Sequence, residues 1–381
     1  MTHSWTLECS HCGNTASAAG LPTVCPKCNE PWLVRYASAP PASAKAALLS
    51  RPWTMWRYHE WMPIQPGEEP VTLGEGMTPL LPWPALEKAA GVKTVWIKDE
   101  SQNPTGSFKA RGLSAAVTAA VRGGAKAFTI PTAGNAGVAL SAYARRAGLT
   151  VTVFAPKTTP ATILEQIRSF GAELVLLDGH IGDCGKAARE LAAKTGAFDV
   201  STLREPYRIE GKKTMGIELA EQLGWRLPTV IIYPAGGGTG LIGMWKAFNE
   251  LKQAGWLNDP MPRFYAVQST GCAPVVKAFN SGAEKTEAWP DPETVASGLR
   301  VPNPLGGRLM LRALKGSDGS AIAVSDSALS AAQVTLASQG LDASPEGGAT
   351  AAALVDLVKQ GRIRREDSVV LFNTGAGWLY R

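Results

Sequence analysis

The chain has 381 residues, of which 45% are hydrophobic and 18% are charged, and its formal net charge is +6. This composition is typical of a globular protein of roughly two to three domains, and it excludes a disordered or fibrous chain. The basic residues are spread along the sequence without a long basic block, which favours small anionic ligands over nucleic acid. We expect no membrane span, because no apolar run approaches about 18 residues, and a cytoplasmic location, because the first residues lack the pattern of a signal peptide.

Two Cys-x2-Cys pairs open the chain, Cys9 with Cys12 and Cys25 with Cys28. Four thiolates on two short turns can bind one tetrahedral Zn²⁺, and the metal then supplies the folding energy that so small a segment lacks. We therefore predict a structural zinc ribbon and linker over residues 1–47. Two disulfides or four unligated thiols are the alternative. A nucleic-acid-binding finger is disfavoured, because the segment has no clustered basic face.

Aromatic residues then follow at nearly helical spacing: Trp53, Trp56, Tyr58 and Trp61. Two interpretations stay open for this stripe. It either packs in the core, or it forms an arm that covers a partner subunit, because aromatic residues are enriched at the centres of interfaces.

After residue 92, short apolar runs alternate with helical stretches. Runs that are so continuously apolar indicate parallel strands buried on both faces, and hence an α/β fold. The predicted strands are 94–98, 127–131, 149–155, 173–179, 197–201, 229–235, 263–268, 321–325 and 368–373. Ligands of such sheets bind at the carboxyl ends of the strands, so the loops after these runs are the candidate sites.

The loop after strand 94–98 reads KDESQNPTGSFKARG and places Lys109 in the first turn of a helix. The positive end of the helix dipole disfavours the ammonium form there. A neutral amine is what a Schiff-base lysine requires. From this segment alone, a solvated surface lysine is the competing interpretation.

The loop after strand 127–131 reads IPTAGNAGVAL and sets Asn135 at the start of a helix. An amide beside open backbone N–H groups suits a planar polar ligand together with a carboxylate. The competing interpretation is an ordinary helix cap.

The loop after strand 229–235 is rich in glycine and opens a helix, so that several backbone N–H groups can converge on one phosphate. The residues in question are Gly236, Gly237, Gly238, Thr239 and Gly240. Their spacing with Gly243 also matches a dinucleotide fingerprint. That fingerprint needs an acidic residue after the next strand, which ends here in Gln268, so a simple phosphate site is favoured.

The last strand, 368–373, is followed by Thr374, which taken alone is an ordinary turn residue. Together with the other loops, however, PTGSFKARG resembles the cofactor-lysine motif of the pyridoxal-phosphate (PLP) enzymes of fold type II. The longer KDES-NPTGSFKARG resembles their threonine synthase branch, and the resemblance extends from the ribbon through EGMTPL at 75–80 to the C-terminus.

The resemblance implies a role for each loop. Lys109 would carry PLP as a Schiff base and later take the substrate's Cα proton, Asn135 would bind the cofactor's O3′, and the glycine loop would bind its phosphate. Thr374 would face the pyridine nitrogen. A neutral hydroxyl leaves that nitrogen largely unprotonated, a setting associated in this family with elimination and replacement.

The resemblance also implies two parallel-sheet α/β domains with PLP at their interface, besides the zinc ribbon. The large PLP-binding domain would comprise residues 48–110 and 211–381, and the small domain residues 111–210. The implied reaction converts O-phospho-L-homoserine and water into L-threonine and phosphate, and we expect a homodimer.

Substrate-binding residues are carried over in the same way. The loop residues Thr132, Ala133, Gly134 and Ala136 would bind the amino-acid carboxylate. Ser201, Thr202 and Arg208, with Lys212 or Lys213, would bind the substrate's phosphate.

Two departures from the family pattern keep the substrate open. Relatives carry an Asn-Ser pair where this chain has Ser201-Thr202, and Leu379 replaces a lysine near the C-terminus. A PLP-dependent threonine or serine dehydratase, or a β-replacement enzyme, is the alternative. A zinc-ribbon binding protein without enzyme activity is a more remote one.

Overall fold

The computed structural model describes residues 4–381, which divide into two compact units. The first unit comprises residues 4–77 and 103–214, and the second comprises residues 78–102 and 215–381. This grouping differs from the predicted domains, which were drawn from the family resemblance. The domain division therefore stays a prediction.

The first unit begins with a small antiparallel sheet in the order β2-β1-β3. Its strands are β1 (Trp5–Cys9), β2 (Thr15–Ser17) and β3 (Trp32–Tyr36). The register sets Cys9 opposite Trp32, so one cysteine pair lies where β1 ends and the other lies shortly before β3. Two 3₁₀ segments follow, η1 (Ala42–Ser50) and η2 (Met55–Trp61), so part of the predicted linker is helical.

The aromatic stripe lies in and before η2, and three of its four members are buried. Trp56, Tyr58 and Trp61 are at most 9% exposed, which confirms the packing interpretation for them. Trp53 differs, because it is 67% exposed and stacks against the guanidinium of Arg57 at 4.7 Å. Whether Trp53 contacts a partner subunit stays a prediction.

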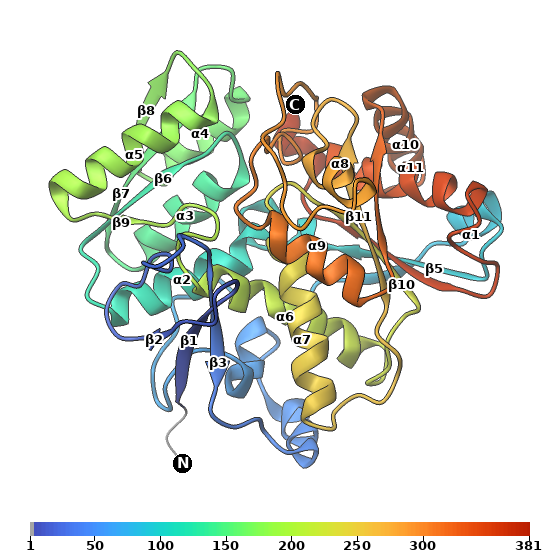
Figure 1. Ribbon diagram of the computed structural model, residues 1–381, viewed down its shortest axis with the longest axis horizontal. Helices are drawn as coiled ribbons and strands as arrows, with labels where there is room; N and C mark the ends of the chain where they lie inside the picture. Colours follow the sequence, from blue (N-terminus) through green and yellow to red (C-terminus); the bar gives the residue numbers. More distant parts are fainter. Residues whose placement is uncertain (1–3) are drawn as a thin grey trace. The chain divides into compact units, whose positions relative to one another are not determined.

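The first unit also holds a parallel sheet in the order β8-β7-β6-β9, drawn in green in Figure 1. Its strands are β6 (Ala127–Pro131), β7 (Thr150–Pro156), β8 (Glu173–Leu177) and β9 (Phe198–Asp199). The helices are α2 (Lys109–Arg122), α3 (Asn135–Arg146), α4 (Ala161–Ser169) and α5 (Ile181–Thr195), with the short η4 (Pro104–Gly106) ahead of α2. Strand β8 ends two residues earlier than predicted, because the backbone N–H of His180 donates to Asp183 and begins α5.

The second unit is built on a six-stranded sheet in the order β12-β11-β10-β13-β5-β4. The strands are β4 (Leu80–Pro82), β5 (Thr94–Asp99), β10 (Val230–Pro234), β11 (Arg263–Ser269), β12 (Ser320–Val324) and β13 (Ser368–Asn373). All neighbours pair in parallel except β4, which runs antiparallel to β5 at the edge. The parallel sheet is confirmed, and β4 is an addition that the sequence did not predict.

Helices complete the second unit (Figure 1). They are α1 (Pro84–Ala90), α7 (Thr239–Gln253), α8 (Pro274–Asn280), α9 (Gly307–Gly316), α10 (Asp326–Ser338) and α11 (Pro345–Lys359), with the short η3 (Glu100–Gln102) and η5 (Gly377–Tyr380). One helix, α6 (Tyr207–Gln222), begins in the first unit and ends in the second.

Strand side chains such as Val95, Ile97, Val369 and Leu371 form the core of the second unit together with α11, and all are at most 2% exposed. The α/β class is therefore confirmed. Among residues 4–381, no helix is both long and apolar enough to span a membrane.

Candidate active site and metal centre

Lys109 is the first residue of α2, as predicted, and a tight loop precedes it. The loop reverses at Thr105 and Gly106, both of which have positive φ angles, of 64° and 69°. Thr105 pays a steric cost in this conformation, which favours glycine. The Asn103 side chain accepts a hydrogen bond from Gly76 N–H at 3.0 Å, which anchors the loop. Lys109 is partly exposed, and its Nζ lies 3.9 Å from the centroid of the Phe108 ring.

Asn135 is the first residue of α3, also as predicted, and it lies at the carboxyl end of β6. The Thr132 hydroxyl binds within the same turn, because it accepts from Gly134 N–H and donates to the Gly134 carbonyl, each at 3.1 Å. The predicted carboxylate-binding residues 132–136 thus form one compact turn. This turn belongs to the same unit as Lys109, and η4, just before Lys109, packs against α3.

A buried carboxylate, Glu75, connects these elements of the first unit. It accepts hydrogen bonds from Tyr143 Oη at 2.6 Å, from Ser114 Oγ at 2.5 Å and from Trp56 Nε1 at 2.9 Å. Burial and the charge of Glu75 raise the pKa of Tyr143, which therefore stays a neutral donor. Glu75 was not among the predicted site residues. Only its position in the EGMTPL segment at 75–80, which resembles the family, could have marked Glu75 as a site residue.

In the second unit, the glycine loop connects β10 to α7. A Cβ on Gly236 would lie 2.1 Å from the Gly298 carbonyl oxygen, and one on Gly240 would lie 1.9 Å from Tyr233 Oη. Gly238 has a positive φ of 75° and abuts Met310. Side chains larger than hydrogen are thus disfavoured at all three positions. The N-terminus of a helix with such a loop is an anion-binding arrangement.

Thr374 follows β13 in a turn in which both of its neighbours, Asn373 and Gly375, form hydrogen bonds. Asn373 donates through Nδ2 to Asp99 Oδ1 at 2.8 Å and accepts from Ser344 N–H at 3.2 Å. Ser344 N–H also donates to the Gly375 carbonyl at 3.0 Å. Thr374 is 5% exposed. Asn373 and Asp99 were not predicted as site residues, although Asn373 ends the predicted strand 368–373 and Asp99 directly follows the predicted strand 94–98.

Glu346, in the first turn of α11, joins the glycine loop to the Thr374 turn. Its Oε1 accepts from Gly298 N–H at 2.7 Å, and Gly298 packs against Gly236 through its carbonyl oxygen. Ser344, two residues before Glu346, caps α11 and binds the Thr374 turn. Both loops therefore belong to one cluster at the carboxyl edge of the sheet. Glu346 was not among the predicted site residues.

Arg208 lies in the first turn of α6 and is 1% exposed. Its Nη1 donates to the Val200 carbonyl at 2.8 Å, while its Nε is buried without a hydrogen-bond partner among residues 4–381. The Glu205 carboxylate accepts the backbone N–H groups of Tyr207 and Arg208. Burial raises the pKa of Glu205 to about 7, against the opposing effect of the Arg208 charge.

The other residues predicted to bind the substrate's phosphate differ in their exposure and in their hydrogen-bond partners. The Ser201 hydroxyl donates to Asp199, and Thr202 is exposed. Lys213 is fully buried and pairs with Glu210 at 2.7 Å, and Glu210 also accepts from Tyr36 Oη at 2.6 Å. The side chain of Lys213 is thus part of the packing between the ribbon and α6.

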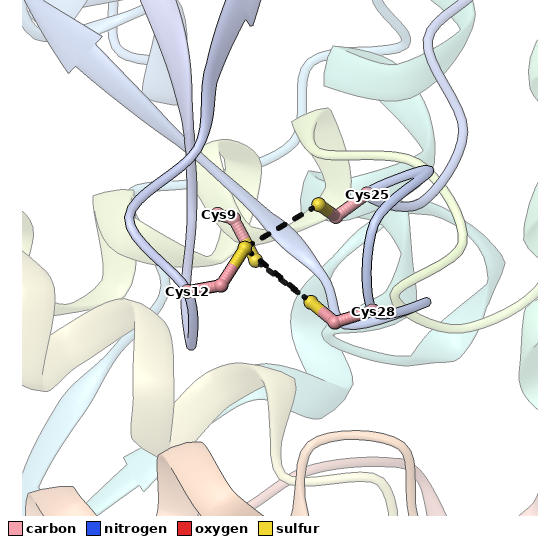
Figure 2. A group of neighbouring side chains, drawn as sticks. All are labelled: Cys9, Cys12, Cys25 and Cys28. Carbon is pink, nitrogen blue, oxygen red and sulfur yellow. Dashed lines mark hydrogen bonds between the residues drawn. The ribbon is translucent and has the colours of Figure 1, made fainter.

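The four N-terminal cysteines converge, with one sulfur from each lying within 4.8 Å of all the others. Figure 2 shows their side chains pointing toward one another. The Sγ atoms of Cys9 and Cys28 lie 3.4 Å apart, and those of Cys12 and Cys25 lie 3.8 Å apart. A disulfide would need about 2.05 Å, so the disulfide alternative is wrong here. Sulfurs about 2.3 Å from one tetrahedral Zn²⁺ would lie about 3.8 Å apart, which these distances fit.

Backbone hydrogen bonds to the sulfur also favour a thiolate at Cys25. Burial raises the pKa of this thiol, but hydrogen bonds from the N–H groups of Lys27 and Cys28 and from the thiols of Cys9 and Cys12 together lower it to about 7. A cluster with such a thiol is suited to a cation such as Zn²⁺.

Comparison with known proteins identifies the family. A family model described as "Pyridoxal-phosphate dependent enzyme" matches residues 71–375. The chain belongs to this family. It is 34% identical over 371 residues to the threonine synthase of Methanosarcina acetivorans, covering 97% of this chain and 91% of that protein. It is also 34% identical to the threonine synthase of Mycobacterium bovis, covering 86% and 89%. The predicted threonine synthase-like family membership is confirmed.

Two solved structures share the fold. Maize serine racemase matches with a TM-score of 0.69 at 24% identity, covering 79% of this chain and 88% of that one. A fungal L-serine ammonia-lyase from Rhizomucor miehei matches with a TM-score of 0.67 at 25% identity, covering 79% and 94%.

The residues of this PLP-family chain fit the cofactor group by group. Lys109 offers a primary amine for the aldehyde, and the glycine loop offers a helix N-terminus for the phosphate. Thr374 offers a neutral hydroxyl and Asn135 an amide. In addition, Glu346 Oε2 is buried without a hydrogen-bond partner in the described part of the chain, beside the glycine loop. This oxygen is an acceptor, so it needs a hydrogen-bond donor such as a water molecule and is not itself a phosphate ligand.

Proposed function

We propose that the chain is a PLP-dependent threonine synthase, which converts O-phospho-L-homoserine and water into L-threonine and phosphate. The observation that carries the proposal is Arg208, a fully buried arginine with an unused Nε donor, in the unit that also contains Lys109. It is a second anion-binding candidate, separate from the glycine loop that suits the cofactor's own phosphate. The 34% identity to threonine synthases over most of the chain supports it.

When bound, PLP supplies an electron sink that stabilises negative charge at the substrate's Cα. We propose that Lys109 holds the aldehyde carbon through Nζ and, once released, moves the Cα proton as a neutral amine. Asn135 would orient the ring through O3′, the glycine loop would hold the phosphate, and Thr374 would leave the pyridine nitrogen largely unprotonated.

The substrate residues are proposals of the same kind. The turn of residues 132–136 would bind the substrate carboxylate through its N–H groups. Arg208 would bind the substrate phosphate, assisted by Ser201 and Thr202, and Lys212 and Lys213 contribute positive charge to the same helix.

We also propose the wider organisation. The cofactor would be held jointly by a large domain of residues 48–110 and 211–381 and a small domain of residues 111–210, with one Zn²⁺ in the ribbon. The enzyme would be a cytoplasmic homodimer that binds neither nucleic acid nor membranes. The absence of clustered basic residues from the sequence supports the exclusion of nucleic acid.

An assay panel tests the proposed reaction. Purified protein with PLP is given O-phosphohomoserine, threonine, serine or O-acetylserine, and the release of phosphate, ammonia and acetate is followed separately. We expect phosphate from O-phosphohomoserine together with an equal amount of threonine. Ammonia from threonine or serine, without phosphate release, would instead identify a dehydratase. The structural match to an L-serine ammonia-lyase is the observation that favours this alternative.

Thr374→Asp is expected to change the spectrum of the PLP-loaded enzyme and to slow turnover. A carboxylate facing the pyridine nitrogen favours its protonated form, whereas the native hydroxyl does not. Absorbance spectra and steady-state rates measure the two effects, with Thr374→Ser as the matched control that keeps the hydroxyl. An unchanged spectrum and rate in Thr374→Asp would show that Thr374 does not face the ring.

Metal analysis is expected to give about one zinc per chain, because four thiolates complete one tetrahedral site. Replacing Cys25 with Ser should abolish zinc binding and unfold the ribbon, since in small zinc modules metal binding supplies on the order of 10 kcal/mol of folding energy. Zinc content and thermal unfolding check this, and Cys184→Ser is the control, because Cys184 is buried elsewhere in the unit. Zinc-free active protein would contradict it.

A further inference from the structure

We propose that the N-terminal ribbon (residues 4–36) positions α6, the helix that carries Arg208, and that Tyr36 and Glu210 are the positioning residues. Through this contact the ribbon determines how tightly the enzyme binds a phosphorylated substrate. The inference rests on the proposed function, because that function assigns the substrate's phosphate to Arg208.

The ribbon contacts α6 through the end of its last strand. Tyr36, the last residue of β3, donates through Oη to Glu210 Oε2 at 2.6 Å. The same oxygen lies 2.7 Å from Lys213 Nζ, and this Nζ lies 4.3 Å from the centroid of the Tyr36 ring. Glu210 and Lys213 are both 0% exposed. A buried ion pair is stable only when further hydrogen bonds satisfy its atoms, so the Tyr36 hydroxyl contributes to the stability of this pair.

A second contact between the ribbon and α6 lies one turn earlier. Tyr207, the first residue of α6, donates through Oη to the Ala18 carbonyl at 3.1 Å. The two residues of the ion pair follow three and six positions later, so all three side chains lie on one face of the helix. The ribbon also packs against the end of α2, where a Cβ on Gly123 would lie 2.3 Å from the Gly20 carbonyl oxygen.

A different face of α6 packs against α2, the helix that begins at Lys109. A Cβ on Gly211 would lie 2.1 Å from the Arg111 carbonyl oxygen, and one on Gly112 would lie 3.1 Å from the Arg208 carbonyl oxygen. The two helices thus cross at glycines with their backbones in close contact. The first turns of α6 are therefore held between α2 and the ribbon.

Arg208 depends on the backbone of α6 for its position, because its side chain makes few hydrogen bonds of its own. Within the described residues, its Nη1 donates to the Val200 carbonyl at 2.8 Å, whereas its buried Nε has no acceptor. The ribbon contacts at Tyr207 and Glu210 lie on either side of Arg208 in the sequence. A shift in the first turn of α6 moves the guanidinium, and about 1 Å is enough to weaken an oriented contact with a phosphate.

The cysteine cluster lies at the other end of the same pair of strands. In the register of β1 and β3, Cys9 is opposite Trp32 and Trp5 is opposite Tyr36. Zinc bound by the cysteines would hold the two strands together at one end, while the other end presents Tyr36 to α6. We therefore expect zinc content and phosphate binding to be linked.

Hydrogen exchange of the full-length chain tests the contact without any substrate. Tyr36→Phe removes only the hydroxyl, so we expect the amides of residues 207–214 to exchange about tenfold faster, the effect of one lost hydrogen bond to a charged group. Arg35→Ala is the matched control. Arg35 precedes Tyr36 on β3, is exposed, and pairs with Glu8 at 3.2 Å, so its loss should leave exchange in α6 unchanged.

Removal of zinc tests the link to the metal. After a chelator has removed zinc from the wild-type chain, with the released metal measured by the colour of the chelator complex, the same amides should exchange faster. Reloading with zinc should restore the slow exchange. Zinc-free protein that exchanges as slowly as the zinc-loaded chain would overturn the link.

Measurements on the PLP-loaded enzyme separate positioning from general damage. In Tyr36→Phe, KM for O-phosphohomoserine should rise by about 2- to 30-fold, the range for coupling through packed side chains, while kcat changes little. Threonine has no phosphate, so its affinity, measured by titrating the cofactor's absorbance, should stay the same. Glu210→Gln disrupts the same contact from the helix side, so combining it with Tyr36→Phe should give less than the sum of the two effects.

Unchanged exchange in Tyr36→Phe would overturn the contact, as would an equal effect of Arg35→Ala. Faster exchange with an unchanged KM, or with an equal loss of threonine affinity, would overturn the positioning role. Exchange is measured without substrate and does not depend on the reaction catalysed. Faster exchange in a chain that releases no phosphate from O-phosphohomoserine would support the ribbon contact and refute the proposed substrate.

Discussion

Lys109→Ala is expected to reduce threonine formation by about 10³-fold or more. The amine has two duties in the proposed reaction, since it binds the aldehyde of PLP and then transfers the Cα proton, and proton transfer by a positioned group alone contributes about 10²–10⁴-fold. Steady-state assays with O-phosphohomoserine measure the loss. Borohydride reduction of the wild type, followed by peptide mass spectrometry, should locate the cofactor on Lys109.

The fold is expected to survive this substitution, because Lys109 is partly exposed and lies in the first turn of α2. Lys126→Ala is the control, an exposed lysine just before β6 in the same unit. Activity near that of the wild type in Lys109→Ala would refute the entire assignment of a PLP site.

Arg208→Ala is expected to lower kcat/KM for O-phosphohomoserine by about 10- to 150-fold for each charged hydrogen bond lost, on the order of 1.5–3 kcal/mol. A neutral substrate such as serine or threonine has no phosphate to lose, so its kcat/KM should change much less. The ratio of the two values, measured in wild type and variant, isolates the phosphate contact from general damage to the site.

Because Arg208 is buried, a control must separate the loss of phosphate binding from a loss of stability. Its guanidinium lies beside Glu205 and Asp199, so its removal leaves two carboxylates without a neighbouring positive charge and is expected to lower stability as well. Arg208→Lys keeps the charge without the planar fork, and should recover stability better than phosphate discrimination. Equal losses on both classes of substrate would remove the reason to prefer threonine synthase over a dehydratase.

The sequence predicted most strands because they are continuous apolar runs. Strands 127–131 and 368–373 were predicted with the ends that the structure has. Strand β4 escaped prediction because it has only three residues, follows Pro79 and ends in a proline, so no apolar run marks it. It is stabilised by pairing with β5, a contact outside its own segment.

For the candidate site as for the strands, the sequence predicted features that neighbouring residues mark and missed features that depend on distant contacts. Lys109, Asn135 and the glycine loop lie at the starts of helices, and glycine spacing and turn residues mark such places within a few residues. Glu75 contacts Tyr143, 68 positions away, and Asn373 contacts Asp99, 274 positions away. No periodicity in the sequence reports such pairs, so only the folded chain reveals these side chains as supports of the site.

The crossing at Gly112 and Gly211 restricts how this protein can diverge. A methyl group at 211 meets a backbone carbonyl, which cannot move aside without separating the helices, whereas at 112 it meets chiefly the flexible end of Lys212. Substitutions at 211 should therefore be lost from any functional library. At 112, an added Cβ would lie 2.8 Å from Lys212 Cε and 3.1 Å from the Arg208 carbonyl oxygen, so alanine there needs only a small adjustment and should be tolerated better than at 211.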